Sequence, residues 1–153
     1  MDRGKSCSNI SESQIIIEFN HTAEMNFDIL YKKALDVSLP RDLTPGYSSC
    51  GGVGSALITK GGNIYTGICV DCSSGIGFCA EHAAIAEMLK NKESEITEII
   101  AVRENGNVVS PCGRCRELVM QIDVKNRDTI VHLSGNQIKK MNELLPDYWI
   151  TAA

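Results

Sequence analysis

The chain has 153 residues, a net charge of −4 at pH 7 and seven cysteines, and 43% of its residues are hydrophobic. This composition excludes a wholly disordered chain, and the length predicts a single domain over residues 1–153, in which residues 1–20 are expected to fray. The acidic balance argues against a nucleic-acid-binding face, and no apolar run approaches the roughly 18 residues of a membrane span or forms a secretory signal.

The first half of the chain predicts a helix followed by a hairpin. Apolar residues at helical spacing predict an amphipathic helix from Thr22 to Val37, and a loop bracketed by prolines follows it. A strand from Ser55 to Thr59, a turn over residues 60–63 and a returning strand from Ile64 to Val70 then read as a β-hairpin.

The second half alternates predicted helices with strands. The predicted helices are Cys79–Asn91, a helix that begins at Pro111, and Gln137–Leu145, and the predicted strands are Ile96–Val102, Val108–Val109 and Thr129–Leu133. This order predicts the α/β class, as a three-layer α/β/α fold with a mixed sheet of five strands. The sheet is expected to be mixed because the hairpin is antiparallel and the crossover helices connect parallel strands.

Three cysteines stand at two predicted helix starts. Cys79 begins one helix, and Cys112 and Cys115 lie on the same side of the first turn of another. Helix N-termini favour thiolates over thiols. Three thiolates can hold Zn²⁺ tetrahedrally and leave a fourth position for water, so the pattern predicts one catalytic zinc ion per chain. Metal binding also explains a high cysteine count in the reducing cytoplasm, where we expect this protein to reside.

Glu81 lies two residues after Cys79 in the sequence. A carboxylate at this distance can reach a metal-bound water, take a proton from it and return the proton to a leaving group. We therefore predict hydrolytic chemistry with Glu81 as the catalytic residue.

The two segments that carry these residues, Cys-Ala-Glu at 79–81 and Pro-Cys-Gly-Arg-Cys at 111–115, resemble the zinc-dependent cytidine deaminase family. The resemblance covers roughly Gly46 to Trp149. It implies that zinc-bound hydroxide attacks C4 of a cytosine-type ring, and that Glu81 protonates ring N3 and then the departing amine. It also implies a free nucleoside substrate, namely cytidine or deoxycytidine in pyrimidine salvage, and a homotetramer.

The positions that usually contact ribose differ from the family pattern. Family members carry an Asn and a Glu on the strand before the first zinc ligand, and Cys69 and Asp71 occupy the matching positions here. The Phe that usually precedes the family's Val-Gly pair corresponds to Gly51. We expect Cys69 and Asp71 to contact the substrate, although a thiol is a weaker hydrogen-bonding partner than an amide.

The residue that follows Cys-Ala-Glu also differs. Many family members carry an Arg there, which offsets the negative charge of three thiolates on zinc, whereas this chain has His82. Either Arg114 or Arg116 is expected to supply this charge by hydrogen bonding to a ligand sulfur.

Two alternatives to cytidine deamination remain open. Residues 111–118, residues 143–146 and Trp149 are similar to blasticidin-S deaminases, so the substrate can be another aminopyrimidine compound such as blasticidin S. A non-catalytic protein can instead hold a structural zinc through four cysteines, Cys69, Cys72, Cys112 and Cys115. The gap between these two pairs, residues 73–111, exceeds the usual spacing of about 15–20 residues, and this site leaves Cys79 and Glu81 without a role.

Overall fold

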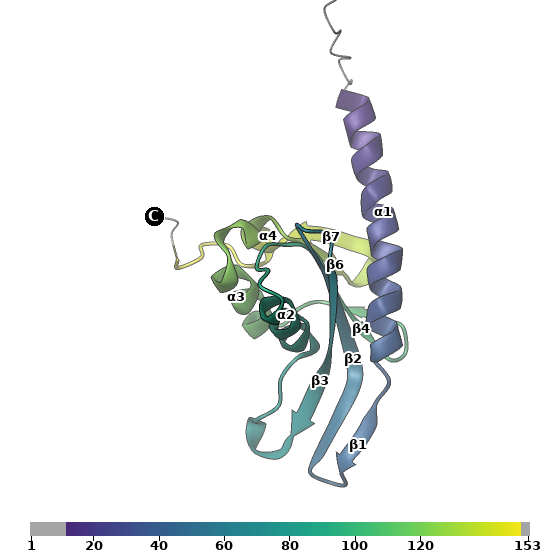
Figure 1. Ribbon diagram of the computed structural model, residues 1–153, viewed down its shortest axis with the longest axis vertical. Coiled ribbons are helices and arrows are strands. Elements are labelled where there is room, and N and C mark those ends of the chain that lie inside the picture. The colour runs from purple at the N-terminus through teal and green to yellow at the C-terminus, as the bar shows by residue number, and fades with distance from the viewer. Residues whose placement is uncertain (1–11, 151–153) are drawn as a thin grey trace, which may run out of the picture.

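The computed structural model describes the backbone of residues 12–150 and the side chains of residues 25–150. One mixed sheet of seven strands runs in the order β1-β2-β4-β6-β7, with β3 paired to β2 and β5 paired to β4. Helix α1 covers one face of this sheet, and α2 and α3 cover the other (Figure 1). The predicted α/β fold with helices on both faces is confirmed, and the sheet is larger than the five strands we expected.

The first half of the chain forms helix α1 (Glu12–Val37), strand β1 (Arg41–Thr44) and the hairpin of β2 (Ser48–Thr59) and β3 (Ile64–Cys72). Helix α1 begins before the predicted start at Thr22, and its first turns project beyond the sheet (Figure 1). The stretch expected to fray is therefore helical over residues 12–20, and residues 1–11 lie outside the described part. Strand β1 is absent from the prediction because its four residues are all exposed and carry no apolar alternation.

Strand β2 reaches further back than predicted, through the glycine-rich segment at residues 51–54. Its pairing with β3 shifts register between Cys50 and Gly54, which marks a bulge, and Gly51 has a φ of +82° that favours glycine. A Cβ atom on Gly54 would lie 2.0 Å from the carbonyl oxygen of Ala34 in α1. The absence of a side chain at Gly54 therefore allows α1 to lie directly on β2.

The second half contains α2 (Ala80–Lys90), β4 (Ile96–Arg103), β5 (Val108–Val109), α3 (Gly113–Ile122) and β6 (Ile130–Leu133), all close to their predicted bounds. Strands β4 and β6 are parallel, and the other pairs are antiparallel, so the sheet is mixed as expected.

The predicted helix over Gln137–Leu145 is wrong in its first half. Residues Gln137–Lys140 form strand β7, which pairs antiparallel with β6, and only Met141–Leu144 form a helix, α4. All four side chains of β7 are exposed, so local sequence carries little signal for a strand. Backbone pairing with the edge of β6 overrides the helical propensity of this segment.

The core is split by the sheet into two clusters. Leu57 and Ile99 pack with residues of α2 and α3 on one face, while Ala56 and Ile100 pack under α1 on the other. Successive side chains of a strand point to opposite faces, so each central strand contributes to both clusters. Burial on both faces explains the continuous apolar run that predicted β4.

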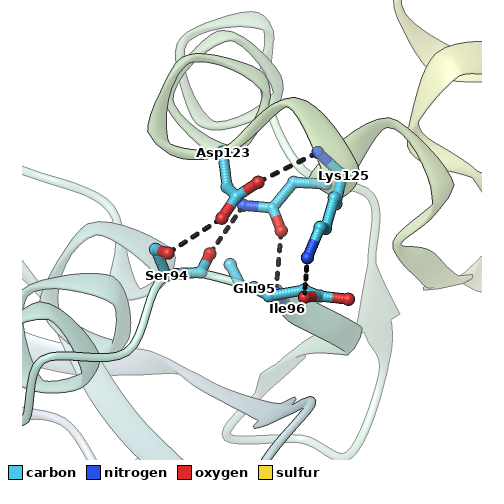
Figure 2. A network of polar contacts seen from close by, with 6 residues as sticks. Ser94, Glu95, Ile96, Asp123 and Lys125 are labelled. Atoms are coloured by element: carbon cyan, nitrogen blue, oxygen red, sulfur yellow. Dashed lines mark hydrogen bonds and ion pairs between the residues drawn. The ribbon is translucent and has the colours of Figure 1, made fainter.

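A polar network fastens the start of β4 to the turn after α3 (Figure 2). Ser94 donates to the carboxylate of Asp123 at 2.8 Å, and Lys125 forms a 2.8 Å ion pair with Glu95. The backbone N–H of Ile96 donates to the side chain of Asn126 at 2.7 Å. These contacts fix α3 relative to β4.

Within residues 12–150, no helix combines the length and the apolar character needed to cross a membrane.

Candidate active site

Three thiols converge where two helices on the same face of the sheet begin. Cys79 is the N-cap residue of α2, Cys112 is the N-cap residue of α3, and Cys115 lies in the first turn of α3. The sulfur of Cys112 lies 3.7 Å from that of Cys79 and 3.3 Å from that of Cys115, and all three sulfurs are within 4.8 Å of one another. The buried Pro111 precedes this turn, as expected for the entry of a helix.

This arrangement fits a zinc ion. Sulfurs at 2.3 Å from a tetrahedral zinc are about 3.8 Å apart, close to the separations of these thiols. Within the described residues, this is the single cluster of at least three cysteine, histidine or acidic side chains that can hold a metal. Cys69 and Cys72 do not belong to it. A zinc ion held by these three thiols would have one tetrahedral position left for water, unlike a closed structural site with four cysteines.

The pKa values of the three thiols are shifted in different directions. Burial raises the pKa of Cys79, and burial followed by the charge of Glu81 raises the pKa of Cys115. Burial also raises the pKa of Cys112, but hydrogen bonds from the backbone N–H and the thiol of Cys115 outweigh it, and the net pKa is lowered. Cys112 therefore loses its proton more readily than Cys79 and Cys115, and coordination of zinc by all three sulfurs would release protons.

Glu81 lies in the first turn of α2 and is only 5% exposed. Burial raises the pKa of its carboxyl, although hydrogen bonds from its own backbone N–H and from the Cys115 thiol oppose the shift. A carboxyl whose pKa is raised toward neutrality is suited to accept and return a proton. Glu81 and the thiols of Cys79 and Cys112 line the same cavity, of about 580 Å³.

The cavity also contains the residues expected to contact the substrate. Cys69 and Asp71 lie near the end of β3 and line its wall, and Cys72 lies beside them. The thiol of Cys69 donates to the carbonyl oxygen of Gly51 at 2.7 Å, and burial raises its pKa. The Cys69 side chain therefore faces β2 as a neutral thiol, and Asp71 is exposed.

The two candidate arginines occupy different surroundings. The guanidinium of Arg116 donates to the carbonyl oxygens of Pro111 and Leu144, both at 2.9 Å, and so ties α3 to α4. Arg114 is exposed and lines the cavity. Burial, followed by the positive charge of Arg114, lowers the pKa of His82. Within residues 25–150, neither arginine forms a hydrogen bond to a ligand sulfur, and that contact stays a prediction.

One charged residue of the cavity wall, Arg103, is absent from the sequence-based site. It is the last residue of β4 and pairs in the ladder with Val53, which also lines the cavity. Its position directly after the buried run Ile96–Val102 was the available signal, because functional groups often follow the end of a central strand. Nothing in the local sequence indicates which site a residue at this position would face.

Comparison with known proteins identifies the family. The model of the cytidine and deoxycytidylate deaminase zinc-binding region matches residues 44–131, a range that includes the three thiols and Glu81. The chain belongs to this family. The predicted resemblance is confirmed, and the donor set of Cys79, Cys112 and Cys115 fits the zinc ion for which the family is described.

Several named proteins are similar to this chain. Blasticidin-S deaminase of Bacillus cereus is 32% identical over 104 residues, which span 61% of this chain and 74% of that protein. Cytidine deaminase of Mycobacterium tuberculosis is 31% identical over 70 residues, 45% of this chain and 53% of that protein, so this match spans about half of the relative's length. The crystal structure of cytidine deaminase from Mycobacterium leprae has a TM-score of 0.68 and 26% identity, covering 80% of this chain and 98% of that chain.

Proposed function

We propose that this protein catalyses the hydrolytic deamination of a free aminopyrimidine nucleoside, converting cytidine or deoxycytidine to uridine or deoxyuridine with release of ammonia. The observation that carries the proposal is the convergence of three thiols and the buried Glu81 on one cavity. Membership of the deaminase family and similarity to cytidine deaminases support it.

The chemistry divides between the metal and Glu81. Cys79, Cys112 and Cys115 would hold the zinc, which when bound acts as a Lewis acid and lowers the pKa of a coordinated water toward neutrality. Glu81 accepts a proton and delivers protons to ring N3 and then to the departing amine. Overall, one water adds to C4 and one ammonia leaves, so a carbonyl replaces the exocyclic amine. The burial of Glu81 supports this assignment because it raises the carboxyl pKa.

A second candidate substrate is blasticidin S. It is favoured by the similarity to the Bacillus cereus blasticidin-S deaminase. The presence of Cys69 and Asp71 in the cavity wall favours it too, because these residues replace the usual Asn and Glu of the ribose site.

We further propose that the chain acts as a single domain, in the cytoplasm, as a homotetramer that takes a small-molecule substrate and no nucleic acid. The one sheet shared by the described strands, the net charge of −4 and the family resemblance support this proposal. Light scattering of the purified protein measures its mass in solution, and a monomer would contradict the tetramer.

The test of the proposed function is an ammonia-release assay with the zinc-loaded protein over cytidine, deoxycytidine, cytosine, adenosine and blasticidin S. We expect turnover of cytidine and deoxycytidine, whereas turnover of blasticidin S without cytidine would establish the second candidate. Zinc analysis of single Cys→Ser variants tests the site itself. Loss of zinc from Cys69→Ser but not from Cys79→Ser would contradict the catalytic site and support a structural one.

A further inference from the structure

Cys69 and Cys79 lie opposite each other across a short backbone pairing in the wall of the catalytic cavity. Val70 and Phe78 form an antiparallel bridge and exchange two backbone hydrogen bonds, of 2.9 and 3.0 Å. In this register the residue before Val70 lies opposite the residue after Phe78. Such neighbours form a non-hydrogen-bonded pair, in which the Cα atoms are about 4.5 Å apart. Disulfides span Cα distances of about 4.4–6.8 Å, so this position suits a cross-strand bond.

The contact of β3 with α2 places the Cys69 side chain on the side of Cys79. Side chains alternate along a strand, so Cys69 shares its face of β3 with Gly67. A Cβ atom on Gly67 would lie 2.4 Å from the carbonyl oxygen of Ala80, the residue that follows Cys79. Both thiols are half-buried and line the same cavity, so a small oxidant can reach them.

Both thiols are free, and each has a different neighbour in the reduced protein. The thiol of Cys69 donates to the carbonyl oxygen of Gly51 at 2.7 Å, whereas the sulfur of Cys79 lies 3.7 Å from that of Cys112. Rotation of the two side chains about their Cα–Cβ bonds would exchange these contacts for a bond between them. A metal ligand must be a thiolate, so Cys79 cannot hold zinc while it is joined to Cys69. The two states exclude each other.

We propose that Cys69 and Cys79 form an oxidation site, at which a peroxide joins them in a disulfide that withdraws Cys79 from the zinc site and inactivates the enzyme until the bond is reduced. The proposal rests on the deaminase function proposed above and adds a means of regulating it. Cys69 stands where the family usually has Asn, which cannot form this bond. In a reducing cytoplasm such a bond is transient, as in redox-sensing proteins.

The step balances with hydrogen peroxide as the oxidant. The Cys79 thiolate attacks one peroxide oxygen, the O–O bond breaks, and a sulfenic acid and hydroxide form. The Cys69 thiol then attacks the sulfenic sulfur, an S–S bond forms, and water leaves. The hydroxide takes a proton from solvent and becomes a second water. The two sulfurs lose two electrons in total, which reduce the peroxide, and a dithiol reverses the step by exchange.

The experiment treats the zinc-loaded full chain with hydrogen peroxide and follows zinc release with a chromogenic chelator too weak to remove zinc from the untreated protein. Free thiols are then alkylated, and mass spectrometry of the digested protein maps the disulfides. We expect zinc loss together with a linkage of Cys69 to Cys79, and recovery of both thiols and of zinc binding after dithiothreitol. Retention of zinc, zinc loss without this linkage, or linkage of Cys112 to Cys79 or Cys115 in its place would overturn the proposal.

A single variant removes the second thiol without removing a hydrogen-bond donor. Cys69→Ser can still donate to Gly51, and the untreated variant should hold zinc as the wild type does. Peroxide should release that zinc at least about tenfold more slowly, because the thiol held opposite Cys79 is gone. Cys72→Ser is the matched control, since Cys72 also lines the cavity but alternation places it on the opposite face of β3 from Cys69. Equal release rates in the wild type and Cys69→Ser, or slower release in Cys72→Ser, would refute the assignment.

The linkage and the zinc release are measured without turnover. If none of the nucleosides nor blasticidin S releases ammonia, the proposed function fails, while these two measurements still decide the oxidation site. Ammonia release that continues unchanged after peroxide treatment refutes only this inference.

Discussion

Glu81 and Cys112 show how burial and hydrogen bonds at a helix start shift the pKa values of single residues in opposite directions. The carboxyl of Glu81 is almost fully buried, and burial raises its pKa, whereas hydrogen bonds from the first turn of α3 lower the net pKa of Cys112. The raised pKa favours the protonated form of the Glu81 carboxyl, and the lowered pKa favours release of the proton from the Cys112 thiol. Both groups receive hydrogen bonds at a helix start, and these outweigh burial at the exposed Cys112 but not at the buried Glu81.

Replacing Glu81 by Gln should separate proton transfer from metal binding. Glu81→Gln keeps the size and polarity of the side chain but cannot accept and return a proton, so kcat should fall by about two to four orders of magnitude. Metal analysis should find the same zinc content as in the wild type. Glu87→Gln, the same change on the same helix outside the thiol cluster, serves as the control. Normal turnover by Glu81→Gln would refute the assigned role.

A second shifted residue lies outside the site, where Tyr65 donates to Glu93 at 2.6 Å. The hydrogen bond to Glu93 and burial raise the pKa of Tyr65 to about 12. The neutral phenol is therefore favoured in the folded protein. Its contribution to stability is fully present below a pH of about 10, the ordinary tyrosine pKa, and is lost as the pH rises through about 12.

This shift predicts a change in the ultraviolet titration of the tyrosines. In Glu93→Gln the pKa of Tyr65 should fall toward about 10, so more tyrosinate should absorb near pH 11 than in the wild type. Adding Tyr65→Phe to this variant should remove the difference. Glu95→Gln is the control, because Glu95 pairs with Lys125 and not with a tyrosine. Identical titrations of the wild type and Glu93→Gln would contradict the prediction.

At the scale of elements, the sequence predicts buried segments well and exposed ones poorly. Strand β4 and helix α2 were predicted closely because both faces of β4 and one side of α2 are buried, which leaves a clear apolar pattern. Strands β1 and β7 were missed because all their side chains are exposed, and only pairing with a neighbouring strand defines them. The start of α1 was also missed, since its first turns project beyond the sheet.

The residues of the candidate site also divide into those with a local sequence pattern and those placed only by strand pairing. Cys79, Glu81, Cys112 and Cys115 were predicted from local spacing at helix starts, because the first turn of a helix has a fixed geometry. Arg103 could not be found in this way. Its place in the cavity depends on the pairing of β4 with β2, which brings residues 53 and 103 together from distant parts of the chain.

Contact between β3 and α2 should not tolerate a methyl group. A Cβ atom on Gly67 would lie 2.3 Å from the backbone nitrogen of Ala84 and 2.4 Å from the carbonyl oxygen of Ala80. Gly67→Ala must therefore push the strand from the helix that carries Cys79 and Glu81. We expect it to lower the free energy of unfolding by about 3 kcal/mol or more and to reduce zinc content.

Denaturant unfolding measures the stability change in this variant. Gly61→Ala is the matched control, because the nearest atom to its Cβ belongs to the end of the Glu93 side chain, which can move. The control should change the free energy of unfolding by less than about 1 kcal/mol. A Gly67→Ala variant as stable as the wild type would show that β3 and α2 can separate without cost.

At the scale of the whole molecule, the thiol cluster connects two helices that are distant in sequence. Cys79 belongs to the start of α2, and Cys112 and Cys115 belong to the start of α3 on the same face of the sheet. An ion held by all three sulfurs fastens these helices to each other. Because the cluster forms only in the folded chain, zinc binding adds to the free energy of unfolding.

Removing zinc should therefore lower the melting temperature. At a free zinc concentration about 100 times its dissociation constant, binding contributes about 2.7 kcal/mol, and a chelator should remove this contribution. Differential scanning calorimetry with and without chelator measures it. Cys69→Ser should retain the full response to zinc, and Cys79→Ser should lose it. The opposite pattern would place the metal at the four cysteines of the structural alternative, Cys69, Cys72, Cys112 and Cys115.

The division of the cavity wall between helix starts and strand ends has a consequence for how such an enzyme can change over time. The residues assigned to the reaction, Glu81 and the three thiols, come from α2 and α3, whereas Cys69, Asp71 and Arg103 come from the ends of β3 and β4. A mutation at a strand end can reshape substrate selection while the reaction centre stays intact. Changes of specificity, natural or engineered, are therefore expected at these strand ends, where a substitution leaves Glu81 and the three thiols in place.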